Sequence, residues 1–283
     1  MQFGFSVATV NPRGWPEIAR VGDELGYESV WLPEHLVLPV AASGSPYEGN
    51  DHPPVPSDIP IFDVFAQLAY LAALTTNIKL GTNVYNIGLR HPFITARGAT
   101  TVDVLSNGRL AFGIGASWLR SEWAAVGLDF DSRGARVDEA IEVCRRLWTE
   151  PVIEHHGRFF DFDPVAFEPK PIQPGGPALH IGGDGAAALR RAATVGTGWM
   201  PMNHSLDDLG PSLDRLRELC AGVGRETPVE VTLHGRDVQR PDDVARYADA
   251  GVTRLIVQPW TRSREAPEAL ARFVDEVIRP LGE

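Results

Sequence analysis

Four short stretches of this 283-residue chain place polar or small residues directly after apolar runs. They are Glu34-His35, Asn83 to Asn86, Ala116 to Glu122 and Gly182 to Ala186. An imidazole or a carboxyl group can take up and release a proton, and a glycine-rich turn exposes backbone N–H groups to an anion. These residue types therefore indicate proton transfer beside a bound polar ligand.

The elements that must position these residues alternate regularly between strand and helix. Apolar runs typical of strands begin near residues 2, 29, 80, 110, 178, 198, 229 and 254, and each is followed by a helical period. Eight such repeats predict an α/β fold, a (β/α)8 TIM barrel. Because a TIM barrel carries its active site at the carboxyl ends of its strands, all four stretches are expected on one rim.

Two segments interrupt the alternation within an otherwise single domain over residues 1–283. Residues 150–177 form an insertion between helix 4 and strand 5, with a hairpin around Gly157 followed by a proline-rich connection from Pro164 to Pro177. Pro39 to Pro60 is a long loop without periodicity. Loops of this length are often functional, so we expect both segments to shape a ligand pocket.

His35 is the strongest candidate for a general acid or base, and the alternative is a histidine that only satisfies a buried backbone group. Gly182-Gly183-Asp184-Gly185 follows a strand and opens a helix, which suits a phosphate or another anion. The glycines could equally serve only a tight turn. This stretch lacks both the Walker lysine and the spacing of the dinucleotide-binding fingerprint.

Composition excludes several classes of function. The net charge of −11 argues against broad nucleic-acid binding, and no apolar run is long enough to cross a membrane. The start of the chain does not resemble a secretory signal, and the two cysteines have no metal or redox spacing, which favours a cytoplasmic protein. His155 and His156 would face opposite ways on a strand, and we expect no metal site.

Three groups of residues in the central βαβ unit carry a family resemblance. They are Arg90-His91-Pro92, Ser106 to Leu110, and Gly113 to Ala116 followed by Trp118 and Glu122. In this order and spacing, the chain resembles the bacterial luciferase-like family of flavin and deazaflavin oxidoreductases.

The resemblance implies roles for individual residues. Glu34 and His35 would contact the cofactor and handle the substrate proton, although the family commonly has Asp-His there. A non-proline cis peptide at Asn83-Val84 would back the cofactor ring. The remaining cofactor contacts implied are Asn86, Ala116, Ser117, Ser121, Gly182, Gly183, Gly185 and Ala186. Trp118 replaces the catalytic Glu of the sugar-phosphate dehydrogenases, which argues against a sugar-phosphate substrate.

The resemblance leaves three functions open. The first is an oxidoreductase that transfers hydride between C5 of the deazaflavin F420 and a small organic substrate, with His35 as proton partner and Glu34 helping to position it. The second is a monooxygenase that uses reduced FMN and dioxygen, with a separate reductase supplying the reduced cofactor. The third is a flavin-binding barrel without turnover. Members of the family are commonly homodimers, so a homodimer is expected.

Overall fold

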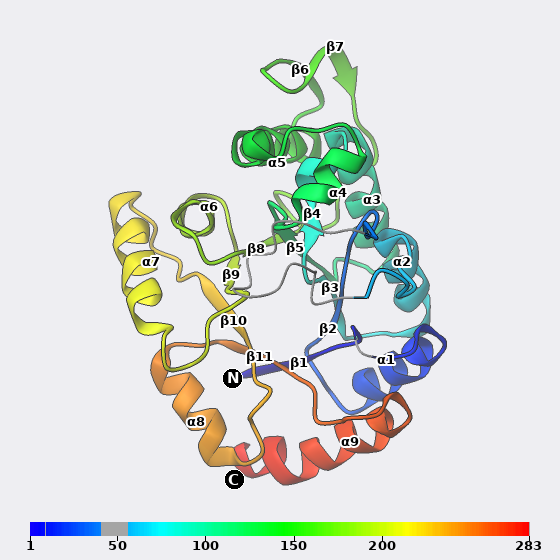
Figure 1. Cartoon of the computed structure of the whole chain (residues 1–283), viewed down its shortest axis with the longest axis vertical. Helices are drawn as coiled ribbons and strands as arrows, with labels where there is room; N and C mark the ends of the chain where they lie inside the picture. Colours follow the sequence, from blue (N-terminus) through cyan, green and yellow to red (C-terminus); the bar gives the residue numbers. More distant parts are fainter. Residues whose placement is uncertain (9, 41–55, 283) are drawn as a thin grey trace.

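Eight parallel strands close a barrel in the computed structural model, which describes residues 1–8, 10–40 and 56–282 (Figure 1). The strands are β1 (Gln2–Ser6), β2 (Ser29–Leu32), β3 (Lys79–Thr82), β5 (Leu110–Gly115), β8 (Ala178–Gly182), β9 (Gly198–Met200), β10 (Glu230–His234) and β11 (Arg254–Val257). They pair in the order β3-β2-β1-β11-β10-β9-β8-β5, and β3 pairs with β5 through Leu80 and Leu110. The predicted (β/α)8 barrel is confirmed.

Helices surround the strands on the outside of the barrel (Figure 1). They are α1 (Trp15–Glu24), α2 (Val64–Leu74), α3 (Pro92–Leu105), α5 (Arg133–Thr149), α6 (Ala186–Thr194), α7 (Gly210–Gly222), α8 (Pro241–Ala250) and α9 (Ala266–Phe273). Strands covered by helices outside and packed side chains inside must be apolar on both faces. All residues of β2 and of β5 are accordingly buried.

Local chemistry sets the helix ends in the central unit. Helix α3 begins at Pro92, where His91 Nδ1 accepts a hydrogen bond from the Phe93 N–H at 3.2 Å. It ends at Leu105, and the turn that follows contains Asn107 and Gly108, whose φ angles are 57° and 79°. Helix α2 begins at Val64, because the Asp63 side chain caps it by accepting from the Ala66 N–H at 2.9 Å.

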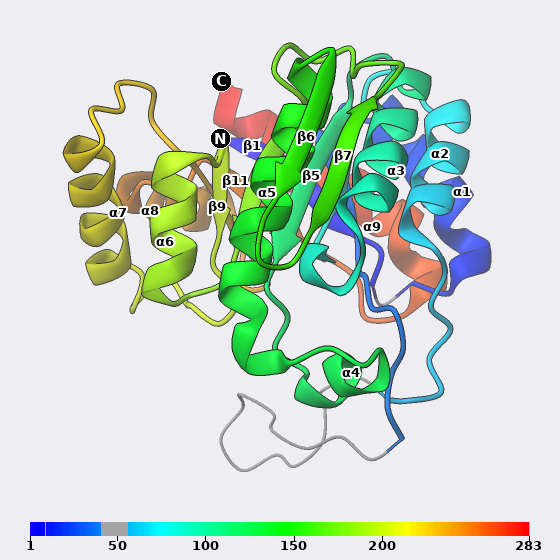
Figure 2. The same cartoon turned by 90° about the horizontal axis from the view of Figure 1, so that it is seen from above.

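The insertion forms an antiparallel two-stranded ribbon outside α5, made of β6 (Val152–His156) and β7 (Asp161–Ala166) (Figures 1 and 2). The hairpin predicted around Gly157 is confirmed. Pro164 was expected in the connection that follows the hairpin, but it lies within β7. The register shifts opposite it, between Ile153 and His155, so the hydrogen-bond ladder needs no N–H at this position. His155 contacts Glu139, whereas His156 contacts Asp161.

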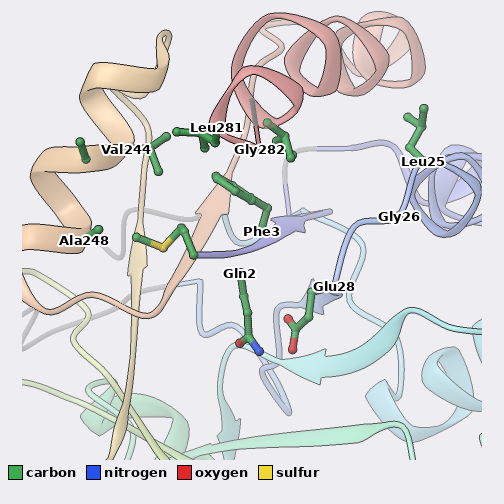
Figure 3. Close-up of a pocket in the computed structure, with 12 residues that line it drawn as sticks. Gln2, Phe3, Leu25, Gly26, Glu28, Val244, Ala248, Leu281 and Gly282 are labelled. Atoms are coloured by element: carbon green, nitrogen blue, oxygen red, sulfur yellow. The ribbon is translucent and has the colours of Figure 1, made fainter.

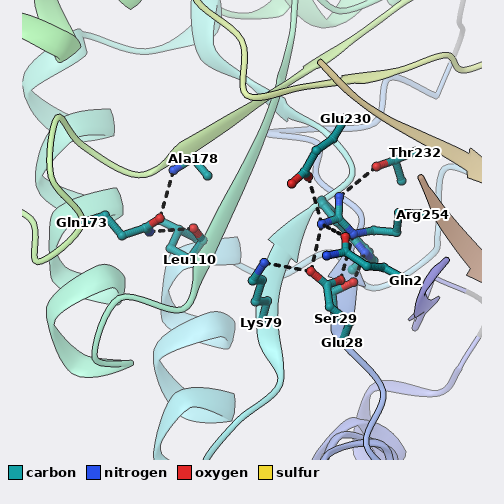
Figure 4. Close-up of polar contacts among 11 residues, drawn as sticks. Gln2, Glu28, Ser29, Lys79, Leu110, Gln173, Ala178, Glu230, Thr232 and Arg254 are labelled. Atoms are coloured by element: carbon teal, nitrogen blue, oxygen red, sulfur yellow. Dashed lines mark hydrogen bonds and ion pairs between the residues drawn. The ribbon is translucent and has the colours of Figure 1, made fainter. Parts of the chain in front are cut away.

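A buried ion cluster fills the end of the barrel where the strands begin (Figure 4). Arg254 donates to both carboxylate oxygens of Glu28 at 2.8 Å, and it also contacts Glu230 at 3.0 Å. Burial alone would raise the pKa of Glu28, but the hydrogen bonds and charge of Arg254 hold it at about 2. Because every charged group in the cluster is paired, the amino end of the barrel is closed by a structural network.

A cavity of about 550 Å³ lies beside this cluster, on the side of the two chain termini (Figure 3). Phe3, Leu25, Val244 and Leu281 give it an apolar lining. The short helix α4 (Arg120–Ala125) lies on the opposite face from both termini (Figure 2). The loop expected over residues 39–60 lies mostly outside the described residues. No helix in the described ranges is long and apolar enough to cross a membrane.

Candidate active site

His35 follows β2 on the rim formed by the carboxyl ends of the strands. Its Nδ1 lies 3.1 Å from Oε2 of Glu122, whose side chain is fully buried in α4. The other carboxylate oxygen, Oε1, accepts from the backbone N–H groups of Leu36 at 2.6 Å and Val37 at 3.3 Å. The ring of Trp118 meets the His35 ring edge-on at 5.9 Å. One carboxylate therefore fixes both the imidazole and the backbone that follows it.

Glu34 faces a different set of partners. Its buried carboxylate accepts from the Asn86 N–H at 2.8 Å and from Arg90 Nη2 at 2.5 Å. Burial alone would lower the pKa of Arg90, but the charge and hydrogen bond of Glu34, together with the nearby Tyr85 and Asp63, outweigh burial and raise it. The expectation that Glu34 positions His35 is not what the geometry shows: Glu122 contacts the imidazole, and Glu34 joins the end of β2 to the short strand β4 (Tyr85–Asn86).

The peptide between Asn83 and Val84 is cis, as the resemblance implies. The Asn83 N–H donates to the Leu32 carbonyl at 2.8 Å, which ties this turn to the end of β2. The Val84 side chain occupies the space beside two glycines of other strands. A Cβ on Gly115 would lie 2.7 Å from Val84 Cγ2, and one on Gly182 would lie 2.8 Å from Val84 Cγ1.

Ala116, Ser117 and Ser121 lead from β5 into α4. Ser117 has a φ of 64°, a conformation that non-glycine residues rarely adopt outside functional or strongly constrained sites. Its Oγ accepts from the Leu119 N–H at 3.3 Å. The Ser121 hydroxyl is buried and has no hydrogen-bond partner among the described residues.

The glycine stretch after β8 opens helix α6 as predicted. Gly183 has a φ of 120°, so a turn explains this glycine. Gly185 has a negative φ, and a Cβ there would meet nothing within 4 Å, so steric need does not explain it. The Asp184 side chain contacts residues 202–203, where its Oδ1 accepts a hydrogen bond from the Met202 N–H at 2.8 Å. Ala186 is the first residue of α6, and the first N–H groups of a helix have no preceding turn whose carbonyls could accept from them.

Two residues on this rim had no individual role predicted from the sequence. Glu122 was part of the motif that carries the resemblance, but its contact with a residue 87 positions away has no signature in the sequence. His234 ends β10, and its ring lies 3.0 Å from the Asn83 side chain. The rule that active sites lie at the carboxyl ends of barrel strands could have identified His234.

The residues on this rim fit a flavin-type cofactor. Asn83 Oδ1 and Ser121 Oγ are buried polar atoms that lack a partner within the described part of the chain, and such atoms normally have one. The amino end of α6 suits the phosphate-bearing chain of such a cofactor. The structure thus brings all the predicted cofactor-contacting residues to one face of the barrel.

The family model for luciferase-like monooxygenases matches residues 1–275. The chain belongs to this family. A relative in this luciferase-like family, an uncharacterized protein of Mycobacterium tuberculosis, is 31% identical over 258 residues, which cover 91% of this chain and 88% of the relative. An FMNH(2)-dependent dimethylsulfone monooxygenase of Pseudomonas fluorescens is 31% identical over 208 residues, or 72% of this chain and 54% of that protein.

Solved structures of luciferase-like proteins share the fold. The monooxygenase RslO1 from Streptomyces bottropensis matches with a TM-score of 0.79 and 23% identity, covering 99% of both chains. The coenzyme F420 dependent tetrahydromethanopterin reductase from Methanopyrus kandleri matches with a TM-score of 0.78 and 17% identity, also over 99% of both chains. The fold is therefore common to a monooxygenase and to an F420-dependent reductase.

Proposed function

We propose that this luciferase-like protein is an F420-dependent oxidoreductase that transfers hydride between the deazaflavin and a small organic substrate. The observation that carries the proposal is the His35 imidazole on the catalytic rim, held through Nδ1 by the buried Glu122 carboxylate. With Nδ1 engaged, Nε2 is the nitrogen left to exchange a proton with a substrate. A carbonyl that accepts a hydride must also gain a proton, and an alcohol that donates one must lose a proton. Either substrate therefore needs such a proton partner.

The residues around His35 have separate tasks in this proposal. The bound deazaflavin supplies the hydride chemistry at its C5. Asn83, Val84, Asn86, Ala116, Ser117 and Ser121 would hold the ring, and Gly182, Gly183, Gly185 and Ala186 would hold the chain. Glu34 fixes Asn86 and Arg90 and so holds in place the segment that would contact the cofactor ring. Trp118, whose ring meets that of His35 edge-on, would help to hold the imidazole in place.

The experiment that tests the proposal compares F420 and FMN, each oxidised and reduced, by fluorescence titration of the purified protein. We expect tighter binding of F420. His35→Ala should still bind the cofactor, but turnover with any substrate found in a panel of alcohols and ketones should fall by about 10²–10⁴-fold. His156→Ala, on the exposed ribbon, is the matched control and should keep full turnover.

The second candidate is a monooxygenase that uses reduced FMN, with a reductase as partner. It is favoured by the 31% identity to the FMNH(2)-dependent dimethylsulfone monooxygenase. Tighter binding of reduced FMN, followed by oxygen consumption, would replace the first proposal with this one. Normal cofactor binding with no turnover in the panel, and no effect of His35→Ala, would favour the flavin-binding barrel. The homodimer stays a proposal that a measured mass in solution would test.

A further inference from the structure

His234 and Asn83 are joined by a hydrogen bond across the mouth of the barrel. Asn83 follows β3 and His234 ends β10, and these strands lie on opposite sides of the closed ring. Asn83 Nδ2 donates to His234 Nε2 at 3.0 Å. The bond therefore spans the interior of the barrel directly below the catalytic rim.

The imidazole of His234 is a fixed acceptor in this pair. Burial lowers the pKa of His234 to about 4, and the charge of Arg236 acts in the same direction, so the ring is neutral near pH 7. A neutral imidazole carries one proton. Because Nε2 accepts the hydrogen bond from Asn83, that proton is on Nδ1.

The far end of the Asn83 amide lacks a partner. Its Oδ1 is buried and accepts no hydrogen bond from any described residue. An amide that is fixed at its nitrogen and unsatisfied at its oxygen is an arrangement that a bound donor would complete. The neighbouring Val84 side chain is packed beside Gly115 and Gly182, so the turn that carries Asn83 has little freedom to shift.

We propose that His234 is a positioning residue for the cofactor ring. It fixes the plane of the Asn83 amide so that Oδ1 accepts a hydrogen bond from an N–H group of the flavin-type ring bound over the barrel mouth. This inference rests on the proposed function, because it needs a ring with such a donor. Deazaflavin and FMN both have one, so the inference holds for either cofactor.

The test measures cofactor affinity in His234→Leu, His234→Gln, Asn83→Leu and the His234→Leu/Asn83→Leu double variant. Dissociation constants for F420 and FMN come from fluorescence titration, and the melting temperature of each cofactor-free protein is measured alongside. His234→Leu should weaken binding about tenfold, the effect of losing one well-placed hydrogen bond. His234→Gln offers an amide oxygen to Asn83 Nδ2 and should restore most of the affinity.

The double variant should bind no more weakly than Asn83→Leu alone, because His234 acts through Asn83. Losses that multiply in the double variant would overturn the inference. Wild-type cofactor affinity in His234→Leu would also overturn it. If that variant had a lower melting temperature with unchanged affinity, the role of His234 would be structural only. If His234→Leu does not fold, the Gln and Asn83 variants still decide. Binding of neither cofactor by the wild-type protein would overturn the proposed function and this inference together.

Discussion

At the scale of residues, the contact between Glu122 and His35 determines which imidazole nitrogen carries the proton when the ring is neutral. In Glu122→Gln, an amide that keeps its oxygen on the Leu36 and Val37 N–H groups would turn its NH₂ toward Nδ1. The proton of His35 would then move to Nε2. We expect turnover to fall on the order of 100-fold while cofactor affinity changes little.

The tautomer can be measured without a substrate. Nitrogen-15 NMR of the His35 side chain should show a protonated Nδ1 in the wild-type protein and a protonated Nε2 in Glu122→Gln. The same tautomer in both proteins would contradict this account. Glu122→Asp, which keeps the charge but shortens the reach, should retain the wild-type tautomer with partial activity.

The residues of the site differ in how far the sequence predicts them. His35, Asn83 and Gly185 could be identified because position after a strand is a local property. The partner of His35 could not, since Glu122 is 87 residues away and reaches it only when α4 folds over the rim. For the same reason Glu34 was expected beside its neighbour in sequence, whereas its carboxylate turns to Arg90.

At the scale of elements, ring closure between β3 and β5 depends on a close approach. A Cβ on Gly113 would lie 1.9 Å from the Thr82 carbonyl oxygen, and Thr82 Oγ1 donates to the Gly113 carbonyl at 2.6 Å. Gly113→Ala must therefore push the two strands apart. We expect it to lower the free energy of unfolding by about 3 kcal/mol, measured by urea denaturation.

Gly134→Ala, in helix α5, is the matched control. A Cβ there would make only an ordinary contact, at 3.6 Å from Arg191 Nη2. It should be neutral or slightly stabilising. Equal losses in the two variants would show that the close approach at Gly113 does not limit stability.

The alternation of strand and helix can be predicted from the sequence because strands and helices have different hydrophobic periods. The boundaries of the elements are harder to predict. The Asp63 cap sets the start of α2, and Pro164 is accommodated in β7 only because the ribbon shifts register. The two-residue strand β4 is too short to show any period, and it forms because the turn at Asn83 brings residues 85–86 beside β5.

At the scale of the whole molecule, stability should depend on pH through buried neutral histidines. Burial lowers the pKa of His180 to about 3 and that of His234 to about 4, both below the usual 6.5. Unfolding exposes the rings, which then take up protons below pH 6.5. The contribution of these two histidines to stability is fully present above pH 6.5 and is lost as the pH falls toward their folded pKa values.

Urea unfolding at pH 7, 6 and 5 tests this expectation. Each histidine contributes a slope of up to about 1.4 kcal/mol per pH unit below pH 6.5. His180→Gln should flatten the slope, whereas His156→Gln, at an exposed position, should leave it nearly unchanged. A free energy of unfolding that is equal at pH 7 and pH 5 would contradict the account.

The interlocking of Val84 with Gly115 and Gly182 restricts how this barrel can evolve. Strands β5 and β8 meet at this one side chain, and each glycine leaves space that the Val84 side chain fills. A larger residue at either glycine collides with Val84, while a smaller residue at position 84 leaves a cavity beside both. Descendants of this chain should therefore change the three positions in concert or retain all of them, so this trio serves as an inherited marker of this part of the barrel mouth.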